Sequence, residues 1–311
     1  MGIGAPGADI CRLLALDGGG AKGFYTLGVL KELEAMIGHP LYQTFDLIFG
    51  TSTGSVIAAL LALGRSVDDI HTLYKEHVPR VMRPVTKSGK SAALKNLADT
   101  VFAGARFEDA KTGLGIVAAR WDFERPMIFK SRVAQAHGRQ ATFVPGFGCP
   151  ISDAVQASCS AYPFFKRKLL TTGTGDKVEL IDGGYCANNP ILYAIAEAVM
   201  ALGTDLPALH VVSVGVGAYP EPRRVGLSWL LRRLASVQLL QKTLEINSLS
   251  MDQLREILFR QVDTVRINET FERSDMAIDM MEHDLTRLNI LFQRGRDSFA
   301  KHEMQLRKSL L

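Results

Sequence analysis

The sequence has no long hydrophobic run and few cysteines, and each shortage excludes a class of protein. Its longest apolar stretch, Val56 to Leu63, is far shorter than the about 20 residues of a transmembrane helix, so any membrane contact would be peripheral. The cysteines lie far apart, without the CxxC spacing of a zinc site or a disulfide framework: Cys11, Cys149, Cys159 and Cys186. Such thiols suit a reducing compartment, and the seven histidines show no metal-ligand spacing.

A strong excess of charge is also missing. The 311 residues include 36 Lys and Arg against 32 Asp and Glu, a formal net charge of +4. This mild excess permits an anionic membrane surface or a nucleotide as partner but gives no reason to expect binding to a nucleic-acid duplex. The N-terminus, from Met1 to Ile10, lacks the basic and apolar regions of a secretion signal, so we expect a cytoplasmic protein.

Two strand–turn–helix units open the chain. Residues 12–16 predict a buried strand, three glycines follow, and apolar residues then recur at helical spacing over 24–37. The same order returns with a strand at 45–49 and a helix at 55–63. Consecutive units of this kind predict a mainly parallel sheet covered by helices on both faces, with ligands at the carboxyl ends of the strands.

The rest of the chain divides by pattern. Further strands are predicted at 127–131, 178–181, 210–216 and 264–268, and we expect the one at 210–216 to close the sheet. Residues 86–91 are rich in Lys, Ser and Gly and predict a mobile surface segment. We expect an α/β catalytic domain over residues 1–218, and a mainly helical C-terminal extension packed on it over 219–311.

A serine stands in the turn of the second unit. Gly50-Thr-Ser52-Thr-Gly54 matches the GxSxG nucleophile elbow and lies directly between a predicted strand and a predicted helix, which is the context that the motif requires. In a strained turn of this kind, Ser52 projects its hydroxyl above the sheet. The alternative is that Ser52 only caps the following helix.

The glycines of the first unit form a second candidate site. Gly18, Gly19 and Gly20 place unencumbered amides at a helix N-terminus, which predicts an anion site such as an oxyanion hole, and Lys22 adds a cation. The competing interpretation is dinucleotide binding, because Gly18, Gly20 and Gly23 satisfy GxGxxG. No acidic residue follows at the distance of about 20 residues that this motif needs.

A carboxylate follows the predicted strand at 178–181. Asp182, which precedes Gly183 and Gly184, would face Ser52 across the same edge of the sheet, or would be only a turn residue. As a base it needs a dry, apolar site, because an ordinary carboxylate is too weak. An esterase triad of Ser52, Asp182 and His210 is the rival arrangement, although His210 begins a strand where the motif wants it to follow one.

Taken together, these motifs resemble those of the patatin-like phospholipases. The blocks are Asp17-Gly-Gly-Gly-Ala-Lys-Gly, Gly50-Thr-Ser-Thr-Gly, the segment 157–165, and Asp182-Gly-Gly followed by Asn188-Asn-Pro190. They occur in family order over roughly residues 11–203. The combination is far more specific than any single block.

The resemblance implies a three-layer α/β/α fold and a lipid acyl hydrolase that needs no metal or other cofactor. Ser52 would be the nucleophile, Asp182 the general base, and the amides of Gly18, Gly19 and Gly20 the oxyanion hole. Lys22 occupies the position at which the family most often has Arg. An ammonium group therefore replaces a guanidinium group that could donate two parallel hydrogen bonds. The substrate would be a membrane phospholipid, reached peripherally at the inner membrane when the enzyme is active.

Proteins of this size and architecture also resemble the phospholipase effectors of cyclic-oligonucleotide anti-phage defence. That resemblance implies a cyclic nucleotide as activator. Two basic clusters would then contact phosphate, or would otherwise be solvated surface: Lys166, Arg167 and Lys168, and Arg223 with Arg224. A homo-oligomer is compatible with the sequence.

Overall fold

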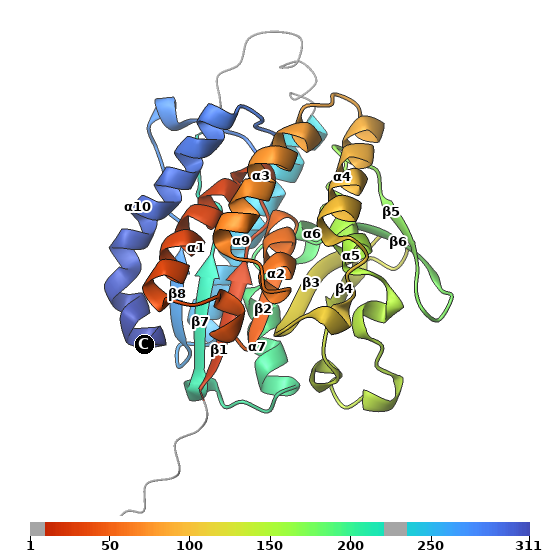
Figure 1. Ribbon diagram of the computed structural model, residues 1–311, viewed down its shortest axis with the longest axis vertical. Helices are drawn as coiled ribbons and strands as arrows, with labels where there is room; N and C mark the ends of the chain where they lie inside the picture. The colour runs from red at the N-terminus through yellow and green to blue at the C-terminus, as the bar shows by residue number, and fades with distance from the viewer. Residues whose placement is uncertain (1–9, 221–234) are drawn as a thin grey trace, which may run out of the picture.

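An eight-stranded mixed sheet forms the centre of the computed structural model, which describes residues 10–220 and 235–311 (Figure 1). The strand order is β5-β6-β3-β2-β1-β7-β8, with β4 beside β3. The strands are β1 (Cys11–Leu16), β2 (Leu47–Thr51), β3 (Gly113–Arg120), β4 (Arg125–Lys130), β5 (Lys168–Thr171), β6 (Lys177–Asp182), β7 (Leu209–Val214) and β8 (Asp263–Ile267).

The sheet has a parallel part and an antiparallel part. Strands β3, β2, β1, β7 and β8 run parallel to one another, whereas β4 and β6 run antiparallel to β3 and β5 runs antiparallel to β6. The parallel strands come from strand–helix units, as predicted, and the mainly parallel α/β fold is confirmed. Their carboxyl ends meet at one edge of the sheet, where the glycine loop and the elbow lie.

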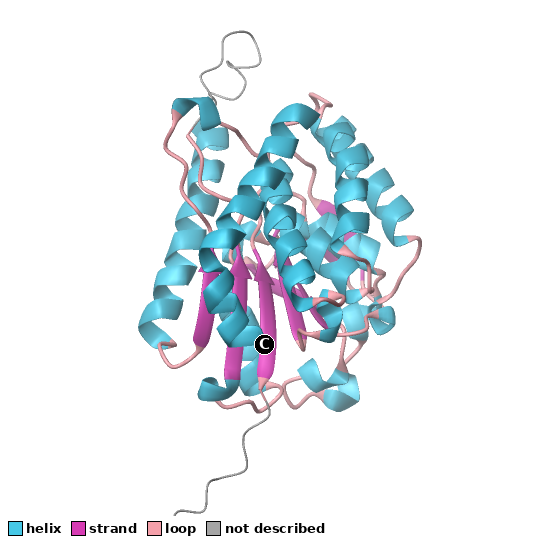
Figure 2. Cartoon of the chain, turned by 60° about the vertical axis from the view of Figure 1, so that its left-hand side comes forward, coloured by secondary structure: helices cyan, strands magenta, loops and turns pink. Residues whose placement is uncertain are grey.

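Helices cover both faces of the sheet (Figures 1 and 2). Strand residues alternate between two cores: Leu14 and Leu16 pack into one, Leu13 and Ala15 into the other. The first core is built with α1 (Gly23–Ile37), α2 (Thr53–Ala62), α3 (Val67–Met82), α4 (Lys87–Phe102), α5 (Ile151–Ser158) and α10 (Leu285–Leu310). The second is built with α6 (Gly184–Ala187) and α7 (Ile191–Met200). Helix α9 (Ala235–Leu258) packs beside both, and its Leu240 and Leu244 belong to the first core.

Helices α1 and α10 pack with their backbones in close contact. A Cβ atom on Gly28 would lie 2.0 Å from the carbonyl oxygen of Phe292, and one on Gly295 would lie 2.0 Å from that of Tyr25. Only glycine permits this approach. The C-terminal helix is therefore fixed to the first helix of the chain.

The structure corrects two expectations. Strand β7 does not close the sheet, because β8 pairs with it in parallel and forms the edge. Residues 86–91 are not an irregular segment: Thr86 caps α4 by accepting a hydrogen bond from the Gly89 amide, and the helix begins at Lys87. The division at residue 218 stays a prediction, and the structure adds that residues beyond it supply β8 to the shared sheet.

Candidate active site

Ser52 lies at a strained turn between β2 and α2. Its backbone has φ of 51°, and a Cβ on Gly50 would lie 2.3 Å from the carbonyl oxygen of Gly54. The Ser52 side chain makes no capping hydrogen bond to α2, although the residue occupies the N-cap position. A left-handed, non-glycine residue in a tight strand-to-helix turn is the geometry of a nucleophile elbow.

Asp182 meets Ser52 because two strands end at adjacent positions of a third. Strand β2 ends with Thr51 opposite Val117 of β3, and β6 ends with Asp182 opposite Ala118. Since β4 occupies the other edge of β3, β2 and β6 share one edge and approach each other end to end. The sequence correctly predicts the meeting, but β6 reaches it as an antiparallel strand.

The Asp182 carboxylate is buried beside the serine hydroxyl. Asp182 is 2% exposed, accepts a hydrogen bond of 2.7 Å from the Gly184 amide, and hydrogen-bonds the Ser52 side chain. Burial raises the pKa of Asp182 to about 7, against the lowering effect of these hydrogen bonds. The site therefore supplies the dry environment in which a carboxylate becomes a stronger base.

The glycine loop lies against the serine and contains two amides that have no acceptor in the described part of the chain. A Cβ on Gly18 would lie 3.2 Å from that of Ser52, so the loop touches the elbow. The Gly18 amide donates to the carbonyl of Asn188 at 2.9 Å, whereas the amides of Gly19 and Gly20 have no acceptor among the described residues. Of the three expected oxyanion-hole donors, Gly18 is thus already engaged.

Lys22 lies farther along the same loop. Burial lowers the pKa of its ammonium group, and the Nζ atom lies 5.9 Å from the centre of the Tyr219 ring. Lys22 lines a polar cavity together with Gly18 and Gly19. Its charge is therefore placed beside the glycine loop, on the side of this cavity.

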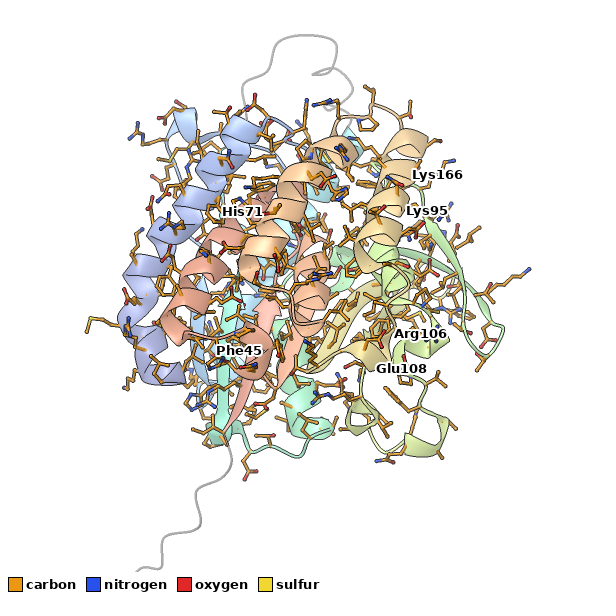
Figure 3. The ribbon with its side chains drawn as sticks, in the orientation of Figure 1. Phe45, His71, Lys95, Arg106, Glu108 and Lys166 are labelled. Carbon is orange, nitrogen blue, oxygen red and sulfur yellow. The ribbon has the colours of Figure 1, made fainter. Side chains whose placement is uncertain are left out.

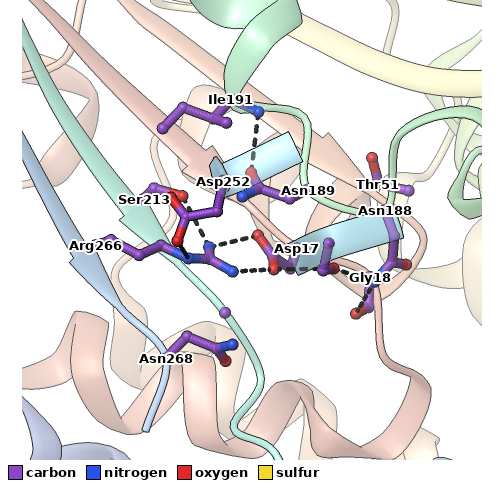
Figure 4. Close-up of polar contacts among 12 residues, drawn as sticks. Asp17, Gly18, Thr51, Asn188, Asn189, Ile191, Ser213, Asp252, Arg266 and Asn268 are labelled. Carbon is purple, nitrogen blue, oxygen red and sulfur yellow. Dashed lines mark hydrogen bonds and ion pairs between the residues drawn. The ribbon is translucent and has the colours of Figure 1, made fainter. Parts of the chain in front are cut away.

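Sequence reasoning missed the buried ion pair that holds the loop. Arg266 of β8 donates to both carboxylate oxygens of Asp17, at 2.8 and 2.6 Å, and to the Ser213 hydroxyl at 2.8 Å (Figure 4). Asp17 is 2% exposed and precedes Gly18 directly. The pair thus connects β1, β7 and β8 at the base of the loop. Because Asp17 and Arg266 are 249 residues apart in the sequence, no local pattern predicts that they meet.

Three further polar residues support the site. Ser158 of α5 accepts from the Ser52 amide at 2.8 Å and donates to the carbonyl of Val117 at 2.6 Å. On α9, Asn247 accepts from the Asn188 amide at 2.7 Å, and Ser248 accepts from the Asn188 side chain at 2.8 Å. The sequence shows Ser158 within a family block but gives no sign of the contacts from α9.

Two cavities of different character flank the glycine loop. An apolar one of about 60 Å³ lies against Ser52 and is lined mainly by aliphatic and aromatic side chains from α2, α3 and α4, such as Val56, Val78 and Leu94. The second cavity measures about 620 Å³ and lies between the loop and α9; its wall carries charged and amide side chains as well as apolar ones, and we call it the polar cavity to distinguish it from the first. Met280 contributes to both.

Other candidate residues lie away from the dyad. His210 is the second residue of β7 and contacts the carbonyl oxygen of Ser309 at 2.7 Å, so the structure does not bring it to Ser52. Arg167 pairs with Glu179 at 2.9 Å and Lys168 with Asp153 at 2.6 Å. The amide of Lys166 donates to Ser91, which places this residue beside α4 (Figure 3). Their phosphate contacts stay a prediction, and Arg223 and Arg224 lie outside the described residues.

Within the described ranges, no group of three or more His, Cys, Asp or Glu side chains could hold a metal ion. None of the described helices is long and apolar enough to cross a membrane.

A family model described as patatin-like phospholipase matches residues 14–195, which contain the glycine loop, the elbow and Asp182. The chain belongs to the patatin-like phospholipase family. A cUMP-AMP-activated phospholipase of Escherichia coli is 63% identical over 97% of this chain and 95% of its own length. A cGAMP-activated phospholipase of Pseudomonas aeruginosa is 28% identical over 71% of this chain and 67% of its own.

Among solved structures, VipD of Legionella pneumophila superposes with a TM-score of 0.50 at 14% sequence identity, covering 98% of this chain and 68% of that chain. This similarity concerns the fold alone. The chain is therefore a patatin-like hydrolase by family and has the patatin α/β fold.

The ion pair at the base of the glycine loop gives a test of how the loop is held. We expect Arg266→Met to lower the free energy of unfolding by about 3–5 kcal/mol, because it leaves the Asp17 carboxylate buried without its partner. Urea unfolding measures this. The matched control is Arg273→Met, whose pair with Asp275 is exposed at 74% and 62% and should contribute at most about 1 kcal/mol. Equal effects of the two substitutions would contradict the role given to the buried pair.

Proposed function

We propose that Ser52 and Asp182 form the catalytic dyad of this phospholipase. The observation that carries the proposal is the buried contact between the hydroxyl of Ser52, on a nucleophile elbow, and a carboxylate whose pKa is raised to about 7. A general base works best when its pKa lies near the operating pH, and this burial brings Asp182 there. Ser158, by accepting from the Ser52 amide, holds the turn in place.

The reaction follows from these positions. The Ser52 oxygen bonds to the carbonyl carbon of a fatty-acyl ester while its proton passes to Asp182, and the carbonyl oxygen becomes an oxyanion facing the Gly19 and Gly20 amides. When this intermediate collapses, the ester C–O bond breaks and the departing lysolipid alkoxide takes the proton from Asp182. Water then loses a proton to Asp182 and attacks the acyl-serine, and the proton returns to Ser52 as the fatty acid leaves.

The apolar cavity against Ser52 supports an acyl-lipid substrate. Its lining of aliphatic and aromatic side chains suits the carbons next to the scissile carbonyl. We infer that the substrate is a membrane phospholipid, bound with its acyl chain toward this cavity. The enzyme would work as a cytoplasmic protein that meets the inner membrane peripherally.

We also propose that a cyclic nucleotide switches the enzyme on, as part of anti-phage defence. The relative that supports this is named a cUMP-AMP-activated phospholipase and is similar over nearly its whole length. A second observation agrees: Ser52 is 8% exposed and Asp182 is 2% exposed, so the dyad of this conformation is closed to a bilayer lipid. Activation then requires a shift of population toward a more open form.

Substitution of the dyad separates catalysis from stability. Under activating nucleotide, Ser52→Ala should abolish release of fatty acid from phospholipid vesicles. Asp182→Asn should lower kcat by roughly 100-fold or more, because the proton acceptor is lost. His210→Ala is the control and should retain turnover in folded protein. A folded His210→Ala protein without turnover would instead point to a Ser–His mechanism.

The pH profile tests the base itself. Asp182 accepts a proton only when it is ionised, so kcat/KM should rise with pH up to the region of its raised pKa of about 7 and level off above it. A carboxylate with an ordinary pKa near 4 would give a profile already flat above roughly pH 5. Initial rates on a soluble short-chain ester at fixed ionic strength measure the profile. A flat profile from pH 5 to 9 would contradict the assignment.

A further inference from the structure

We propose that the polar cavity between the glycine loop and α9 binds the activating cyclic nucleotide. The inference rests on the nucleotide switch put forward above and adds where the ligand binds. The cavity measures about 620 Å³, within the range of roughly 300–1,000 Å³ that is typical of small-molecule sites. A phospholipid headgroup alone would leave most of this volume unfilled.

The lining offers the kinds of group that a nucleotide needs. Lys22 provides a cation for a phosphate. Gln241 carries an amide that can pair with a base edge, and Asn268 offers its amide NH₂ group while its Oδ1 atom accepts from the Gly217 amide. Glu245 can accept a hydrogen bond from an exocyclic amino group. Tyr219, whose ring stacks on Phe271 at 4.9 Å, adds an aromatic surface. A headgroup phosphate would use only the cation.

Asn188 belongs both to the cavity wall and to the packing around the glycine loop. Asn188 is 5% exposed and lines the cavity, and its Oδ1 atom has no hydrogen-bond partner in the described part of the chain. A Cβ on Gly18 would lie 2.4 Å from this oxygen, and one on Gly184 would lie 2.9 Å from it. This oxygen is enclosed by Gly18 and Gly184, so Asn188 links the cavity wall to the residues beside Ser52 and Asp182.

Most of the cavity wall comes from outside the matched family region. The family model ends at residue 195, whereas much of the lining belongs to residues 216–219, to α9 and to residues 268–280. Acyl hydrolysis by the glycine loop, elbow and Asp182 does not need these parts. They add a chamber that opens directly onto the catalytic loop.

Helix α9 connects the cavity to the dyad. Gln241, Leu244 and Glu245 line the cavity. Leu244 also packs against Gly184, and Asn247, which lies outside the lining, accepts a hydrogen bond from the Asn188 amide. A ligand that displaces this helix would therefore disturb contacts next to Asp182 and Gly18. Such a two-position helix is a common means of coupling a binding site to a catalytic one.

The test compares two tryptophan substitutions on α9 in full-length Ser52→Ala protein, where binding is measured without hydrolysis. Gln241→Trp places an indole in the cavity, and Thr243→Trp places one on the exposed face of the helix, outside the lining. Calorimetric titration with cyclic UMP-AMP, without lipid, gives the Kd. We expect Gln241→Trp to weaken binding by roughly tenfold or more and Thr243→Trp to leave it within about twofold.

The outcomes separate the site from the switch. If both tryptophan variants bind the nucleotide equally well, and if both are activated normally when Ser52 is left in place, this cavity is not the site and the switch still stands. Full activity without nucleotide, and no binding by Ser52→Ala, would overturn the switch and the site with it. Normal nucleotide binding combined with a raised KM for vesicles in Gln241→Trp would make the cavity a headgroup site.

A third substitution tests the coupling. Asn247→Ala removes the contact from α9 to the Asn188 amide while leaving the cavity lining intact. We expect the Kd for cyclic UMP-AMP to stay within about threefold, while activation of vesicle hydrolysis falls roughly tenfold or more. Unchanged activation would overturn the role of α9. A loss of binding and activation in equal measure would do the same.

Discussion

The whole site depends on two strands that end against adjacent residues of β3. Strand β2 ends opposite Val117 and β6 ends opposite Ala118, so Ser52 and Asp182 lie side by side and are only 8% and 2% exposed. This burial raises the pKa of the Asp182 carboxyl group, which is the property that its proposed role as general base requires. The same burial costs stability, because the unfolded chain ionises Asp182 from about pH 4 upward whereas the folded one resists ionisation until about pH 7. That cost is absent below both pKa values and grows as the pH rises between them.

The C-terminal region belongs to the same mechanical unit as the catalytic loop. Arg266 of β8 pairs with Asp17 at the base of the glycine loop, and Ser248 of α9 hydrogen-bonds Asn188, whose carbonyl accepts from the Gly18 amide. Residues beyond the family match therefore support the glycine loop at two places. An isolated catalytic core would lose both supports. In the proposed switch, the same region would stabilise the fold and restrain catalysis, because a ligand that moves α9 would act on its contacts with Asn188.

Much of this architecture could be predicted from the sequence, because the determining signals are local. Each strand–glycine–helix unit carries its own periodicity and turn chemistry, and the elbow, the glycine loop and Asp182 each follow a strand.

What could not be predicted depends on pairing between residues that are far apart in the sequence. The antiparallel direction of β6, the grip of Arg266 on Asp17 and the engagement of the Gly18 amide by Asn188 are set by the tertiary fold. Residues 86–91 differ from the prediction for another reason: their Lys, Ser and Gly content is typical of a loop, but Thr86 caps a helix whose apolar side chains pack on the core.

The central claim is that Asp182, with its raised pKa, activates Ser52, and covalent trapping tests it most directly. A fluorophosphonate that modifies activated serines is incubated with the nucleotide-activated protein, and the modified residue and its rate of formation are followed by mass spectrometry across pH. The account predicts a single adduct at Ser52, formed at a rate that rises with pH up to the region of about pH 7 and that collapses in Asp182→Asn. An adduct on another serine, or labelling of Ser52 at the same rate in Asp182→Asn as in the unaltered protein, would contradict it.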